Sequence, residues 1–490
     1  MRTGTKVLRG LTGLGLCGLL AACAGYAPKP LPTQVPWTRP ADLRVDARDI
    51  ALPALAAQPI DLNAPLTMQA VAALAVLNDP RLQAARDRAG VAKAQAFAAG
   101  LLPDPQFSGA REIPLGNSGD ATTTGYNLGL GFDLGRLITR GAAVSAAKAH
   151  LRQVDLQILW QEWQTAAAAE ADYIALVGLR ERDALLGAEH DAVLERLRRD
   201  RAAAATGIEP RATADADLVQ LQALQQKLAD DARQHEARLA ELDALLDLPP
   251  GTPLRLAGLP RFDPDAVQGA AATLDRLPMI RPDLMALQAG YQSQEETLRK
   301  AVLAQFPSVG VELSRARDTS DINTVGFGVT LSLPILNGSR GTIAVQEATR
   351  QTLYDEYALR LRQSRADAER LLADIALLQR QREALQAALP ALRAAARATD
   401  AALREGDATL PQAQAQRQAL LDQRLALQAN ARQLAEQSAA LQLLTGRGVF
   451  APAAHQHTHA KTLSSPSHPP FERIPAEIPM LSVRPRDPSA

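Results

Sequence analysis

Cysteine, aromatic residues and long apolar runs are all scarce in this chain. Its 490 residues include only two cysteines, Cys17 and Cys23, and aromatic residues make up 3%. A disulfide framework is therefore excluded, and the low aromatic content favours long, closely packed helices. Beyond the N-terminal segment no run of 18 apolar residues occurs, so no transmembrane helix is expected. The formal net charge is zero, which gives no reason to expect a nucleic-acid partner.

The N-terminal segment has the pattern of a bacterial lipoprotein signal. Basic residues precede a short apolar stretch, and the tetrapeptide Leu20-Ala21-Ala22-Cys23 follows it. This resembles a lipobox and predicts removal of residues 1–22 and acylation of Cys23, which would anchor the protein in a leaflet. Ala24, in place of an aspartate, favours the outer membrane. The alternative is an ordinary signal peptide that contains a cysteine.

The two ends of the remaining chain differ in composition from its middle. Eight prolines fall within residues 23–65, which predicts an extended leash between lipid and body. Residues 449–490 are rich in Pro, Ser and His and are predicted to be disordered. In that tail His455, His457 and His459 alternate, and all three could converge on one metal ion. The alternative is a tail that is merely polar.

The middle of the chain follows one plan twice. In each half a helical stretch is followed by two strands, a very long helix without a breaker near its start, a Gly-containing turn and a return helix. Pro390 predicts a kink or break in the second long helix. The first repeat spans 66–262, with strands about 106–113 and 124–134 and helices about 136–205 and 211–247. The second repeat spans 263–448, with strands about 308–315 and 324–333 and helices about 342–404 and 409–444.

The predicted strands have one apolar and one small or polar face, and about nine to eleven residues each, which suits a tilted membrane strand. Tyr126 and Phe132 fall on the same face near opposite ends, as interface aromatics do. Four strands cannot close a barrel, and open edges are not tolerated in lipid. Three copies would give twelve strands, the smallest assembly with an open lumen. The alternative is a pair of soluble β-hairpins.

Several local motifs resemble those of the TolC-like outer membrane efflux proteins. They are Asn78-Asp79-Pro80-Arg81-Leu82, Gly100-Leu101-Leu102-Pro103-Asp104-Pro105 and Leu333-Pro334-Ile335-Leu336-Asn337-Gly338, and the first half is similar to the branch that serves heavy-metal RND pumps. The resemblance implies a mainly α fold with a small membrane β-barrel: a homotrimer with a twelve-stranded barrel on an α-helical coiled-coil tunnel across the periplasm. It further implies docking to a periplasmic adaptor and an inner-membrane RND-type pump, with no enzymatic chemistry and no cofactor.

The two helical turns are predicted to form the periplasmic tip, where Gly207 and Gly406 mark contacts with the adaptor. TolC-like proteins often place acidic residues just past this turn, as a ring that narrows the pore. Asp215 and Asp217 occupy that place in the first half, whereas the second half has no carboxylate there and offers only Asp407. The alternative is a solvated acidic face.

Two classes of function remain open. The chain is either a passive export duct for metal ions, small toxic compounds or secreted proteins, or a structural envelope lipoprotein whose helices are spacers. The sequence contains no nucleotide-binding loop, no Ser/His/Asp arrangement and no zinc-like Cys/His spacing. An enzyme is therefore not expected.

Overall fold

The computed structural model describes residues 27–34, 37–46, 50, 52–115, 123–208 and 210–446. All of them belong to the first of two units into which the chain divides, Met1–Ala451. The predicted signal peptide, Cys23 and the histidines at 455, 457 and 459 lie outside the described residues, and so does the predicted tail.

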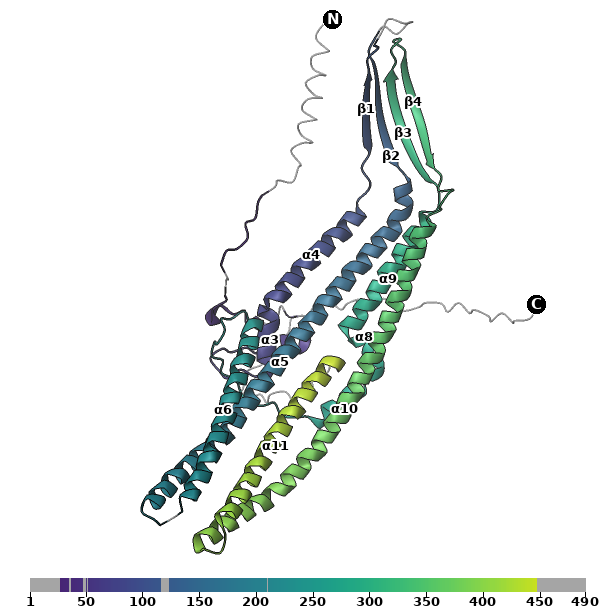
Figure 1. Cartoon of the computed structure of the whole chain (residues 1–490). Coiled ribbons are helices and arrows are strands. Elements are labelled where there is room, and N and C mark those ends of the chain that lie inside the picture. Colours follow the sequence, from purple (N-terminus) through teal and green to yellow (C-terminus); the bar gives the residue numbers. More distant parts are fainter. Residues whose placement is uncertain are drawn as a thin grey trace, which may run out of the picture. The chain divides into compact units, whose positions relative to one another are not determined.

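The fold is mainly helical with one small antiparallel sheet (Figure 1). None of the described helices combines the length and apolar character needed to cross a membrane. The longer helices are α3 (Met68–Asn78), α4 (Pro80–Gly100), α5 (Gly135–Ala205), α6 (Arg211–Leu245), α7 (Pro264–Ala271), α9 (Pro282–Leu303), α10 (Arg340–Glu405) and α11 (Leu410–Thr445). Short segments are η1 (Pro40–Asp42), α2 (Pro53–Ala56), η3 (Leu274–Arg276) and α8 (Leu277–Ile280). The strands are β1 (Gln106–Glu112), β2 (Gly125–Asp133), β3 (Ser308–Arg317) and β4 (Asn323–Ser332).

The helix–strand–strand–helix–helix order occurs twice, and each long element lies within two residues of the range that the sequence predicts. Helix α5 contains 71 residues, which corresponds to about 105 Å at about 1.5 Å per residue. It begins two residues after β2 and ends at the turn before α6. The sheet and that turn therefore lie at opposite ends of one very long helix.

Helix α10 runs through Pro390 without interruption, so the predicted break is wrong, while the alternative, a kink, stays a prediction. Proline removes one intrahelical hydrogen bond and crowds the preceding turn. Long packing against α11 compensates for this loss. One contact lies close to the proline: the Gln423 side-chain amide of α11 donates to the Leu385 carbonyl at 2.7 Å.

The strands form one sheet in the order β1-β2-β3-β4, with every neighbouring pair antiparallel. The central β2–β3 pair joins the two halves of the chain. Its register sets Leu130 opposite Leu313 and Phe132 opposite Val311. Side chains alternate between faces along each strand, so directly opposed residues share a face.

The largest apolar cluster lies around α3, whose residues Met68 and Ala70–Leu77 are buried. Val71 and Leu74 belong to one cluster with Tyr173 and Ile174 of α5 and Leu242 of α6. The Tyr173 hydroxyl donates to the Gly258 carbonyl at 3.0 Å. A helix apolar on all sides is stable only when surrounded. Helix α3 therefore anchors the middle of α5, against which α4, α6, α9 and α11 also pack.

Candidate functional site

The two faces of the sheet differ in side-chain character. On one face, large apolar side chains are exposed to solvent in the single chain: Phe107 and Phe327 are each 73% exposed, and Val329 is 60% exposed. The other face carries mostly glycine and small polar residues. At Gly129 a side chain would collide with those of Glu312 and Ser108, which places all three residues on that face. A broad exposed apolar face indicates burial against something outside the chain.

Both edges of the sheet are open. Within the described residues β1 pairs only with β2 and β4 only with β3. The helices show a similar order, since α10 packs against α9 and α11 while α4 and α6 pack against the far side of α5. Exposed apolar side chains lie on both outer helices, including Phe97 of α4 and Tyr354 of α10. The described part of the chain thus exposes apolar side chains on both of its outer helices.

Glycine makes both helical turns possible. Gly207 has φ +74° and Gly406 has φ +85°, the left-handed region that glycine adopts at least cost. On the far side of the second turn, Thr409 and Gln412 form a capping box that starts α11. The two hairpins α5–α6 and α10–α11 therefore end in sharp turns, as the sequence predicts. The role of these turns in adaptor contact stays a proposal.

The acidic residues predicted near the tip lie in different environments. Asp215 and Asp407 are exposed, whereas Asp217 is completely buried. Its carboxylate accepts a hydrogen bond from the Gln414 amide at 3.2 Å and lies 3.7 Å from Arg196. Burial removes the Asp217 carboxylate from the surface of this chain, and its role in closing the pore or tip stays a prediction. Asp217 joins α5, α6 and α11.

Spacing along α6 explains the burial of Asp217. Ala214 lies three residues before Asp217, and Leu221 and Leu224 lie four and seven residues after it. All three share its side of the helix and are buried as well. This row was available from the sequence as a sign that Asp217 faces a neighbour. Gln414 and Arg196 gave no such sign, because their pairing depends on how the two hairpins lie side by side.

The polar contacts extend from Asp217 into the space between α5, α10 and α11. Arg417 donates to Asp400 at 2.8 Å, and Arg196 lies 3.8 Å from Glu189. Burial raises the pKa of Glu189, and the nearby charges of Arg196 and Arg417 oppose that rise. A cavity of about 250 Å³ lies beside these side chains. The Arg417–Asp400 contact thus joins α10 to α11 within the second hairpin, and the charge of Arg417 also acts on Glu189 of α5.

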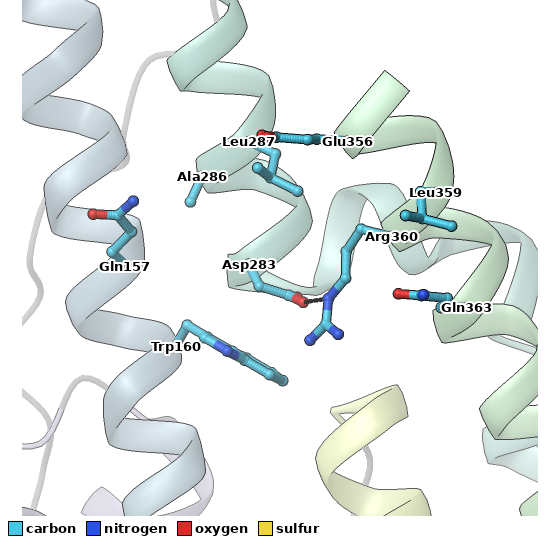
Figure 2. A pocket seen from close by; sticks show the side chains of 9 residues that line it. All are labelled: Gln157, Trp160, Asp283, Ala286, Leu287, Glu356, Leu359, Arg360 and Gln363. Atoms are coloured by element: carbon cyan, nitrogen blue, oxygen red, sulfur yellow. Dashed lines mark hydrogen bonds and ion pairs between the residues drawn. The ribbon is translucent and has the colours of Figure 1, made fainter. Parts of the chain in front are cut away.

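A second charged cluster lies closer to the sheet, between α5, α9 and α10 (Figure 2). Asp283 accepts hydrogen bonds from Arg281 at 2.9 and 2.6 Å and from Arg360 at 2.8 Å. The Arg281 guanidinium lies over the Trp160 ring, 4.9 Å from its centroid, and that of Arg360 lies 5.9 Å away. These contacts connect α5 of the first half with α9 and α10 of the second. They border a cavity of about 420 Å³.

The negative charge of Asp283 is offset by the positive charges of Arg281 and Arg360 beside it. Burial alone would raise the pKa of Asp283, but the hydrogen bonds and charges of Arg281 and Arg360 outweigh it and lower that pKa. Arg281 itself is completely buried, where a charge is tolerated only beside partners. The cluster fixes helix packing and contains no nucleophile next to a base.

The same ion pair occurs in the first half with its signs exchanged. There Asp79 precedes Pro80 and pairs with Arg81 at 3.0 Å, while in the second half Arg281 precedes Pro282 and pairs with Asp283. Asp79 also accepts from the buried Thr165 hydroxyl of α5 at 3.1 Å. Each pair therefore secures a helix start against α5.

Within the described residues no group of three or more His, Cys, Asp or Glu side chains is arranged to hold a metal ion. The histidine triplet at 455, 457 and 459 lies beyond those residues, and metal binding by it stays a prediction.

Known proteins resemble this chain in sequence over part of its length and in fold over most of it. Residues 275–447 match the family model described as outer membrane efflux protein, and a sequence comparison with curated proteins gives no match. CusC has a similar fold, with a TM-score of 0.64 and 16% identity over 77% of this chain and 91% of its own. For the outer membrane protein VceC of Vibrio cholerae the values are 0.64, 16%, 78% and 96%. For the MtrE outer membrane channel of Neisseria gonorrhoeae, in its open state, they are 0.58, 19%, 78% and 89%. The resemblance inferred from the sequence motifs is confirmed in the fold, and residues 275–447 carry the match to the outer membrane efflux protein family.

Proposed function

We propose that this chain, which carries an outer membrane efflux protein domain and the fold of outer membrane channels, is the channel subunit of a tripartite efflux system. Three copies contribute four strands each to a twelve-stranded barrel in the outer membrane. Their helices continue the channel as a tunnel through the periplasm. The channel conducts passively and has no chemistry of its own. The observation that supports this proposal most strongly is the sheet, which has one apolar and one small, polar face and whose two edge strands are unpaired in the described chain.

The sheet supports this assembly on physical grounds. Its apolar face suits lipid, its small polar face suits water, and lipid permits only sheets that are closed. One copy cannot close four strands. Two copies would give eight, whose interior side chains fill, and three give twelve with room for a lumen. A cyclic arrangement also covers the outer sides of α4, α6 and α10, because the same two surfaces meet at every junction.

The partners follow from the position of the helical turns. The tips at Gly207 and Gly406 lie about 100 Å from the sheet along α5, on the side where an inner-membrane RND-type pump and a periplasmic adaptor would lie. Metal ions or small toxic compounds are the proposed substrates, which the pump selects. Acylation of Cys23 would hold the N-terminus in the outer membrane, with the helices in the periplasm. Exposed Asp215 and Asp407 remain candidates for narrowing the tip.

Conductance across a planar bilayer tests the proposal. The full-length protein, purified in detergent, should have the mass of three copies and should form discrete ion-conducting steps when it is added to the bilayer. A correctly folded trimer without conductance would support the alternative, a structural lipoprotein. A folded monomer or dimer without conductance would contradict the barrel itself.

A further inference from the structure

Charge is divided between the two faces of the sheet by sign. The charged residues of the four strands number six, and register assigns each to a face. The small, polar face carries the acidic residues Glu112, Asp133 and Glu312, and the apolar face carries Arg111, Arg315 and Arg317. An apolar face bearing three positive charges and no negative one needs an explanation, because lipid penalises unpaired charge.

The arginines are confined to the end of the sheet farthest from the helices. Arg111 and Arg317 lie directly opposite Tyr126, on its two sides. Arg315 lies one row closer to the helices, between Leu128 and Val325. From Arg315 toward the helices, the face is apolar as far as Val309. The segment of β3 from Val309 to Arg317 is about 27 Å long, at about 3.4 Å per residue. We call Arg111, Arg315 and Arg317 the arginine row.

Among the described residues, one member of the arginine row has an acidic partner and two have none. Arg317 forms an ion pair with Asp321 at 2.5 Å. In the part of the chain that the structure describes, Arg111 and Arg315 have no ion pair. Arg315 is exposed, and its direct neighbours across both strands are apolar. Its long stem can lie along that apolar surface while the guanidinium reaches toward the edge of the membrane.

We infer that the arginine row binds the phosphate groups of lipids in the outer leaflet. The inference rests on the proposed function, because only a lipid-covered barrel brings headgroups to this level. A guanidinium presents a planar fork of donors that matches phosphate oxygens in pairs. Tyr126, between two of the arginines, is the type of aromatic residue that occupies membrane interfaces. Three copies would repeat the row around the barrel and set its height in the membrane.

Lipid binding to the full-length trimer in detergent tests the inference. Native mass spectrometry would count bound molecules of lipid A, a glycolipid with two phosphates, and of its dephosphorylated form. The test variant is Arg111→Gln with Arg315→Gln, which removes the two arginines without a carboxylate partner. The control variant is Arg255→Gln with Arg261→Gln, which removes two exposed arginines from the loop between α6 and α7.

The parent and the control should bind phosphorylated lipid A with the same affinity, and the test variant about tenfold or more weakly, because charge-assisted hydrogen bonds are lost. All three should bind the dephosphorylated lipid equally. Equal binding of lipid A by parent and test variant would overturn the inference. So would full displacement by inorganic phosphate at equal concentration, since the site would then recognise the free ion. Conductance of the same preparation separates this failure from failure of the proposed channel.

Discussion

Asp217 of α6 and Gln414 of α11 form a hydrogen bond of 3.2 Å between the two helical hairpins, 197 residues apart in the chain. The carboxylate is completely buried and also faces Arg196 of α5. One side chain of α6 thus contacts two other helices near the two turns. A hairpin can swing outward only if these contacts break.

Loosening this link should make the tip easier to open. We expect Asp217→Ala to raise single-channel conductance or open probability and to lower stability by about 1–3 kcal/mol, because Arg196 and Gln414 lose a buried partner. Gln414→Ala should act in the same direction with a smaller effect. The control is Glu236→Ala, which removes an exposed carboxylate of α6 far from the turn. Unchanged conductance in both Asp217→Ala and Gln414→Ala would show that the link does not restrain the tip.

Glu312 should influence which ions the channel conducts. It lies in the middle of the small, polar face, next to Gly129, where every charged strand residue is acidic. Glu312→Gln should shift the reversal potential in a salt gradient toward lower cation preference, and more so at low ionic strength, where screening is weak. The Arg111→Gln/Arg315→Gln variant alters the opposite face and should leave the reversal potential unchanged. An effect of the arginine variant alone would reverse the assignment of the two faces.

The buried carboxyl group of Glu170 should make stability depend on pH. Burial raises its pKa from 4.5 to about 8, so the unfolded chain loses this proton first as pH rises. Stability should therefore fall between about pH 4.5 and 8, by on the order of 3 kcal/mol at pH 7. Glu170→Gln should flatten that dependence in urea unfolding measured at several pH values. Glu347→Gln on the exposed side of α10 should leave it intact, and an equally steep dependence in Glu170→Gln would exclude burial as its cause.

Asp283 should be essential for helix packing in the middle of the chain. Asp283→Asn leaves the buried Arg281 charge without its carboxylate, which costs about 3–5 kcal/mol when a buried pair is broken. Because the arginines lower the pKa of Asp283, its contribution is present at neutral pH and is lost as pH falls through that lowered pKa. Urea unfolding measures the loss. Arg365→Gln, in an exposed pair with Glu369, is the control and should change little; a similar loss in both would contradict the role of burial.

Two glycines in different conformations should respond oppositely to alanine. Gly406 has φ +85°, so Gly406→Ala should destabilise the turn by about 1–2 kcal/mol through backbone strain alone, since no atom would crowd the new Cβ. Gly141 lies inside α5 with open space around it, and Gly141→Ala should stabilise by about 0.5–1 kcal/mol. Unfolding midpoints compare the two, and a shift of the same sign in both would refute this explanation.

The sequence by itself determined the elements of this protein. Alternation over 124–134 and 324–333 and the long stretches of helical periodicity are local patterns, and they depend on neighbours within the same segment. The glycine turns at 207 and 406 are equally local. The apolar row that contains Asp217 was also present in the sequence. It predicts that Asp217 is buried on α6, as it is in the structure.

The tertiary structure alone decided which side chains meet. Gln414 reaches Asp217 because two hairpins from different halves lie in register, and Arg360 reaches Asp283 because α10 packs beside α9. Pro390 remains inside α10 because α11 supports the helix there. The pairing of β2 with β3 brought Arg111, Arg315 and Arg317 to one end of one face. Each of these contacts joins residues far apart in the chain, so its energy appears only when the whole chain is packed, and no local pattern encodes it.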